Sequence, residues 1–118
     1  MATQQSKNRR AGAEWETRLL HQLRDTGHNI ERLHLNGCED EGDLILTTGH
    51  KTYVIEAKAG QPHLAQFVKQ ASKEARNYET HRNKTSQSTI GLVVIKQRIK
   101  PWSEAYVVSS LAELLPHL

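Results

Sequence analysis

Residue types that support several common protein architectures are scarce in this 118-residue chain. Cys38 is the only cysteine, which excludes an intrachain disulfide and a cysteine-based zinc site. No apolar run approaches the ~18 residues of a membrane-spanning helix, and residues 1–10 lack the apolar segment of a secretory signal. No glycine-rich loop is followed by Lys-Ser or Lys-Thr, so no nucleotide cofactor is expected. We therefore expect a cytoplasmic protein that makes no contact with membranes.

The excess of positive charge lies at the start of the chain. Lysine and arginine total 16 against 13 acidic residues, a net charge of +3, and Lys7, Arg9 and Arg10 account for all of it. Residues 1–8 show no apolar pattern, which predicts a flexible basic arm. Residues 9–118 have the length of one domain with its own core.

The spacing of apolar residues predicts an α/β domain. Helical spacing predicts helices over residues 9–26 and 62–80, and a short helical turn over 111–115. Alternating and continuous apolar runs predict five strands. These strands are expected over residues 29–35, 43–47, 51–59, 90–96 and 105–109. The order α-β-β-β-α-β-β-α predicts a central mixed β-sheet flanked by helices.

Charged residues interrupt the predicted core strand 51–59. Glu56 and Lys58 point to the same face of it, and burial of an unpaired charge is costly, so that face needs a partner, a metal or a cleft. Asp43 opens the preceding strand, and a hairpin turn near Gly49 would bring it close to Glu56. Two converging carboxylates favour an oxygen-liganded Mg²⁺ or Mn²⁺ site. An ordinary ion pair between Glu56 and Lys58 is the alternative interpretation.

Two segments resemble the core of the PD-(D/E)XK nuclease superfamily, whose fold is restriction-endonuclease-like. They are Gly42-Asp43-Leu44-Ile45 and Tyr53-Val54-Ile55-Glu56-Ala57-Lys58. Within the superfamily, the chain is most similar to the archaeal-type Holliday junction resolvases. These begin with a basic segment, a glycine and a helix that carries one more catalytic glutamate, and residues 9–20 match that stretch. The resemblance covers residues 9–96 and departs from the motif name at Gly42, which replaces its proline.

The resemblance implies a catalytic role for each of these residues. Asp43, Glu56 and the backbone carbonyl of Ala57 would hold Mg²⁺, for which Mn²⁺ can substitute. Lys58 would orient or deprotonate the attacking water. Glu16 would be the additional acid and metal ligand on the first helix.

The choice of helical acid depends on the helix face. Glu16 lies three residues before Leu19 and shares its apolar face, so it can point inward. Glu14 lies about 160–200° away around the helix and is the alternative acid. Either residue can also serve only to complement the helix dipole.

The implied activity is metal-dependent, structure-specific hydrolysis of DNA phosphodiesters, with four-way junctions as the leading substrate. A flap, nicking or broad-specificity endonuclease of the same fold is the alternative, and a non-catalytic DNA-binding module is a second alternative. Two symmetric cuts by a chain with one active site predict a homodimer. Its candidate interface comprises Trp102, Tyr106, Val107 and Leu111–Leu118, which core packing explains equally well.

Basic and amide side chains outside the motifs are expected to contact DNA phosphates. They lie in the first ten residues, along a polar stripe of the second long helix, and in the loop that follows. The predicted residues are Lys7, Arg9, Arg10, Gln70, Lys73, Arg76, Arg82 and Lys84. For the residues on the helix, a solvated surface is the alternative.

Overall fold

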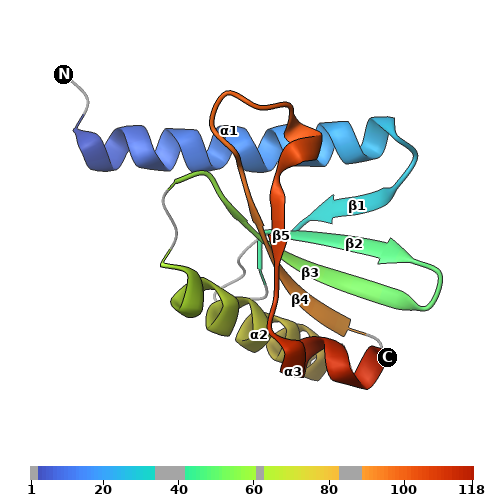
Figure 1. Cartoon of the computed structure of the whole chain (residues 1–118). Coiled ribbons are helices and arrows are strands. Elements are labelled where there is room, and N and C mark those ends of the chain that lie inside the picture. Colours follow the sequence, from blue (N-terminus) through green and yellow to red (C-terminus); the bar gives the residue numbers. More distant parts are fainter. Residues whose placement is uncertain (1–2, 34–41, 61–62, 83–88) are drawn as a thin grey trace.

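The fold is a five-stranded mixed sheet with a long helix on each face (Figure 1). The structure is a computed structural model, and it describes residues 3–33, 42–60, 63–82 and 89–118. The long helices are α1 (Gln4–Asp25) and α2 (Leu64–His81). The strands are β1 (Asn29–Arg32), β2 (Leu44–Thr48), β3 (Lys51–Lys58), β4 (Thr89–Ile95) and β5 (Tyr106–Val108). The short elements are η1 (Trp102–Glu104), α3 (Leu111–Leu114) and η2 (Leu115–His117).

The strands lie in the order β1-β2-β3-β4-β5, so neighbours in the sheet are also neighbours in the sequence. The pairs β1–β2, β2–β3 and β4–β5 are antiparallel, and β3–β4 is parallel. A parallel pair requires a crossover connection, which α2 provides. The predicted order of elements and the mixed α/β sheet are confirmed. The ends of β2 to β5 differ from the prediction by at most one residue, and the predicted end of β1 at residue 35 lies outside the described residues.

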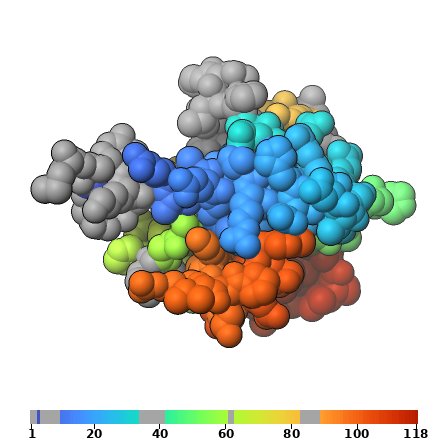
Figure 2. Space-filling view, turned by 90° about the horizontal axis from the view of Figure 1, so that it is seen from above, coloured from blue at the N-terminus to red at the C-terminus, as the bar shows by residue number. Residues whose placement is uncertain are grey.

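The two helices cover opposite faces because side chains alternate along each strand. On one face, Trp15 and Leu19 of α1 pack against Ile55 of β3 and Val94 of β4. The indole Nε1 of Trp15 also donates a hydrogen bond to the Val94 carbonyl at 3.2 Å. Figure 2 shows α1 (blue) lying across this side of the molecule, with the segment between β4 and β5 (orange) beside it.

On the other face, α2 packs against the same central strands. Ala75 and Tyr78 contact Val54 of β3, and Ala71 contacts Val93 of β4. The close approach of α2 to β4 requires a glycine, because a Cβ atom at Gly91 would lie 2.4 Å from the Ala71 carbonyl oxygen. Burial on both faces accounts for the continuous apolar pattern of β4.

A buried polar cluster joins the C-terminal helix α3 to this face. Glu113 is 5% exposed and accepts hydrogen bonds from Ser72 Oγ at 2.7 Å and from the Gly91 amide at 2.8 Å. Arg76 Nη2 forms an ion pair at 2.8 Å with Glu113 Oε2, the oxygen that also accepts from the Gly91 amide. These contacts satisfy a carboxylate whose burial would otherwise be unfavourable.

Helix α1 begins at Gln4, five residues before the predicted start. Residues 4–8, which the sequence predicts to be an unpatterned arm, are therefore helical. They contain no glycine or proline and include glutamine and lysine, which are good helix formers. The first turns extend beyond the sheet (Figure 1), so they need no apolar face, which is the signal the prediction used. Within the described ranges, no helix has the length and apolar character to cross a membrane.

Candidate active site

Asp43 is positioned by the hairpin of β2 and β3. The register pairs Leu44 with Ile55, and the Asp43 amide donates a hydrogen bond to the Ile55 carbonyl at 2.9 Å. The Ala57 amide in turn donates to Asp43 Oδ2 at 2.8 Å, which fixes the carboxylate against β3. Gly42 supplies the bend before β2 with a φ of 95°, a conformation that side-chain-bearing residues rarely adopt. This conformation accounts for glycine at position 42, because proline cannot adopt a positive φ.

Glu56 and Lys58 lie on the same side of β3, as their alternation predicts. Lys58 Nζ contacts Glu56 Oε1 at 3.1 Å, so the ion pair of the alternative interpretation is present. It uses only one of the two carboxylate oxygens. Glu56 is 6% exposed, and its Oε2 atom is buried with no hydrogen-bond partner among the described residues. A buried carboxylate oxygen of this kind has a free position for a cation.

The charges around Asp43 disfavour its ionised form. Burial, the largest cause, and the neighbouring Glu56 raise the pKa of Asp43 from 3.8 to about 7. The carboxylate of Glu16 also raises this pKa, whereas the hydrogen bond from Ala57 and the charge of Lys58 lower it. Two neighbouring carboxylates, those of Glu56 and Glu16, therefore act on Asp43 at the end of β3.

The residues at this site fit a magnesium ion better than a metal whose ligands all come from the protein. Within the described part of the chain, no three histidine, cysteine or acidic side chains are close enough to hold a metal ion by themselves. Mg²⁺ is usually held by one or two carboxylates together with waters and substrate phosphates. Asp43 and Glu56 match that requirement. Ala57 follows Glu56 in β3, and its amide donates to Asp43 Oδ2.

The helical acid is half-buried and ion-paired. Glu16 Oε1 lies 3.1 Å from Arg32 Nε of β1, and the Arg32 Nη2 atom also donates to Thr17 Oγ1 at 2.6 Å. This arginine pair was not predicted, because Arg32 is remote in sequence and belongs to no motif. Glu14 is exposed. Of the two acids, Glu16 is the one whose charge acts on Asp43.

Lys58 lines a cavity of about 580 Å³, which is bounded by residues of the two long helices and of the end of β3. Gly12 of α1 lines one side of it and Phe67 of α2 lines another. Lys58 Nζ lies 4.6 Å from the centre of the Phe67 ring, a cation–π contact that orients the amine. The sequence marks Phe67 only as part of an apolar helix stripe, so its role beside Lys58 was missed.

The predicted DNA-contacting residues have different surroundings. Arg10 and Lys73 are exposed and Gln70 is half-buried. Arg82 lies over the Tyr78 ring at 4.1 Å. Lys7 and Arg9 belong to the first turns of α1, whose side chains are not described, and Lys84 lies outside the described residues.

Arg76, predicted to contact DNA phosphate, has acidic partners within the structure. Its guanidinium forms ion pairs with Glu79 and Glu113, both at 2.8 Å, and donates to the Thr89 carbonyl. These partners hold Arg76 in the cluster that attaches α3. Glu113 is 37 residues away in sequence, and no local pattern connects the two.

Comparisons with known proteins support the fold. No protein-family model matches the chain, and no curated protein matches its sequence. The chain is similar to the solved structure of Hjc, a Holliday junction resolvase from the archaeal hyperthermophile Archaeoglobus fulgidus. The TM-score is 0.52 with 15% sequence identity, and the match covers 86% of this chain and 89% of that chain. The chain therefore has the restriction-endonuclease-like fold that its motifs predict.

Proposed function

We propose that the protein is a metal-dependent endonuclease that cuts branched DNA, with four-way junctions as its leading substrate. The observation that carries the proposal is that the Asp43 and Glu56 carboxylates act on each other, while Lys58 pairs with Glu56 and lines the neighbouring cavity. Fold similarity to a Holliday junction resolvase supports the same reaction class.

Each residue of the cluster has a chemical task in this proposal. Asp43, Glu56 and the Ala57 carbonyl hold Mg²⁺, and the Ala57 amide keeps Asp43 in place. The bound ion supplies Lewis-acid polarisation of the scissile phosphate and a more acidic water. Lys58 would orient or deprotonate the attacking water and offset the charge that develops on the phosphate. Glu16 contributes a further negative charge on the α1 side.

A homodimer is the second part of the proposal, because paired cuts across a junction require two sites. The structure leaves large apolar side chains at the surface near the C-terminus. Leu111 is 67% exposed and Leu118 is 90% exposed, and Val107 of the edge strand is also exposed. We infer that these residues contribute to the subunit interface. Trp102, which the sequence offers for the same interface, packs against the core beneath α1.

The test compares an immobile four-way junction with a linear duplex that contains the same arm sequences. We expect paired, symmetric nicks in the junction with Mg²⁺ and none with EDTA. Equal cutting of both substrates would instead support a flap, nicking or broad-specificity nuclease. No cutting with Mg²⁺ or Mn²⁺ would contradict the enzymatic proposal and favour a DNA-binding module.

A further inference from the structure

A second cavity lies directly beside the candidate catalytic groove. Its volume is about 590 Å³, within the range of clefts that take small ligands. Ala59 and Gly60, which follow β3, line both cavities. The Lys96 amide also donates a hydrogen bond to the Lys58 carbonyl at 2.9 Å, so the wall of the second cavity is attached to the candidate catalytic lysine. A strand of DNA that places a phosphate at Lys58 therefore passes next to this cavity.

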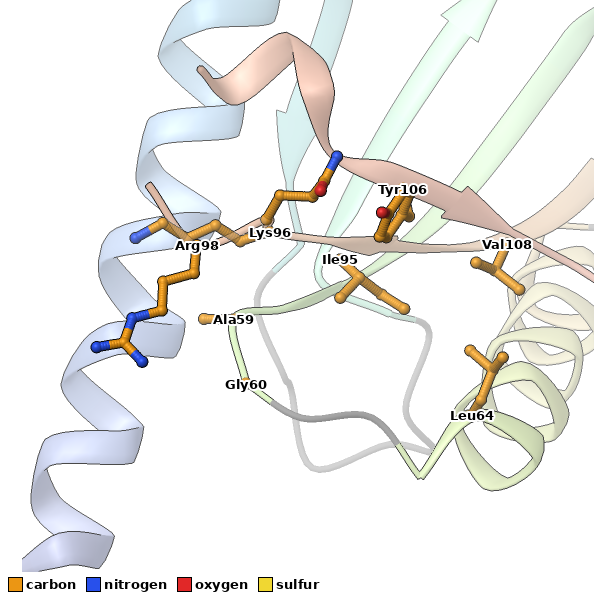
Figure 3. A pocket seen from close by; sticks show the side chains of 9 residues that line it. Ala59, Gly60, Leu64, Ile95, Lys96, Arg98, Tyr106 and Val108 are labelled. Carbon is orange, nitrogen blue, oxygen red and sulfur yellow. The ribbon is translucent and has the colours of Figure 1, made fainter. Parts of the chain in front are cut away.

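The two sides of the cavity differ in chemistry. Leu64 of α2, Ile95 of β4 and Val108 of β5 form an apolar side, and Lys96 and Arg98 extend on the other side, towards α1 (Figure 3). No acidic residue is among the described residues that line it. A ligand that fits both sides has an apolar body and carries negative charge.

Tyr106 gives the cavity an exposed aromatic ring. It belongs to β5 at the edge of the sheet, pairs with Ile95 and is 58% exposed. Exposed aromatic rings beside positive charges are the usual means by which proteins hold unpaired nucleobases. Aromatic residues make up only 5% of the chain, and this exposed one lies beside a cluster of positive charge.

The turn that carries the two cations is held in a defined shape. Gln97 Nε2 donates a hydrogen bond to the Glu104 carbonyl, which joins the turn to η1. Ile99 has a φ of 58°, a left-handed conformation that is unfavourable for a β-branched residue. Such strain persists where the surrounding structure maintains it, often at ligand sites. The positions of Lys96 and Arg98 therefore do not depend on a freely moving loop.

We propose that this cavity binds one unpaired nucleotide of the DNA, next to the phosphate that is cut. The base lies against Tyr106 and the apolar side, and Lys96 and Arg98 contact the flanking phosphates. The inference rests on the proposed function in that it takes DNA as the ligand, and it adds a reason for selecting branched DNA. A branch point offers an unpaired or easily unstacked base, whereas a regular duplex does not.

The test measures binding without cleavage. Fluorescence anisotropy in EDTA compares a duplex with a single-thymine bulge against the same duplex with an abasic bulge, which keeps the phosphates. We expect the full-length protein to bind the thymine bulge about tenfold more tightly, as stacking of one base provides. Tyr106→Ala should abolish this preference. Glu104→Ala is the control, because Glu104 is an exposed residue of the neighbouring η1 that does not line the cavity, and its loss should leave the preference unchanged.

Substitution of the two cationic residues distinguishes the contribution of the charged side of the cavity from that of the apolar side. The double variant Lys96→Ala/Arg98→Ala should weaken binding of both bulged duplexes equally and lower the salt dependence by about 0.7 per lost phosphate contact. Equal affinity of the unmodified protein for thymine and abasic bulges would overturn the inference. So would a dimer that dissociates in Tyr106→Ala when followed by light scattering, since this would assign the edge to a second copy.

Cleavage of the same duplexes with Mg²⁺ distinguishes the two proposals. A thymine preference without any cleavage would support the nucleotide site and contradict the proposed nuclease activity. Cleavage without a thymine preference would support the nuclease activity and contradict the nucleotide site.

Discussion

The stability of the metal-free protein should depend on pH through Asp43. Its pKa in the folded protein is about 7, against 3.8 for an ordinary aspartate, because it is buried beside Glu56. Between these two values the folded state keeps a proton that the unfolded state has released. The free energy of unfolding therefore falls as pH rises through this window. Asp43→Asn removes the ionisable group while preserving an oxygen that can accept the Ala57 amide.

The size of the effect follows from the shift in pKa. A difference of one in pKa corresponds to about 1.4 kcal/mol, so the rise from 3.8 to about 7 amounts to about 4 kcal/mol at high pH. About 2 to 3 kcal/mol of this is lost between about pH 5 and about pH 8. Glu79, whose pKa is also raised by burial, contributes in the same direction in both proteins. The difference between wild type and Asp43→Asn isolates Asp43.

Urea unfolding in EDTA at the two pH values measures this difference. We expect Asp43→Asn to lose about 2 kcal/mol less stability than wild type between them, whereas Asp25→Asn, at an exposed position at the end of α1, should behave as wild type. Mg²⁺ at the higher pH should restore the wild type and leave Asp43→Asn unchanged. Equal losses in wild type and Asp43→Asn would refute the reasoning that burial and Glu56 disfavour the Asp43 charge.

Three further substitutions, one of them with a matched control, test the packing and the backbone. Glu113→Ala should cost about 3 kcal/mol in urea unfolding because it leaves Arg76 and the Gly91 amide without their carboxylate; a loss below about 1 kcal/mol would contradict this. Gly91→Ala should cost about 2 kcal/mol or more because its Cβ would clash with a carbonyl of α2, whereas Gly12→Ala, with open space around it, should gain about 0.5 kcal/mol. Ile99→Gly should raise the free energy of unfolding by about 1 kcal/mol, and with it the thermal midpoint, because glycine adopts the left-handed conformation without strain. A lower midpoint would show that the turn depends on the isoleucine side chain.

The sequence predicts the grouping of Asp43, Glu56 and Lys58 at one end of the sheet because the relevant contacts are local. Asp43 and Glu56 belong to one hairpin, and its register follows from the position of the turn at Gly49 and from the alternation of buried residues. The same alternation places Glu56 and Lys58 on one side of β3. A pattern of a few residues is therefore enough to bring these groups together, whatever their function.

The contacts that the sequence does not predict connect distant elements. Arg76 has the pattern of an exposed helix cation, yet two carboxylates bind it, and one of these is in α3. The cavity beside Tyr106 forms only when β5 pairs with the end of β4, next to the start of α2. The early start of α1 does not follow from the sequence for another reason: an apolar stripe marks a packed helix, and helical turns beyond the sheet need no such stripe.

Single-turnover cleavage of a four-way junction by Glu56→Ala, with binding followed in parallel by gel shift, tests the catalytic role of Glu56 most directly. We expect cleavage with Mg²⁺ to be abolished while the junction is bound as tightly as by wild type, or more tightly, because one negative charge is removed. Glu104→Ala, which removes an exposed carboxylate of η1, is the control and should cut at the wild-type rate. Normal cleavage by Glu56→Ala would contradict the assignment of Asp43, Glu56 and Lys58 as the catalytic centre.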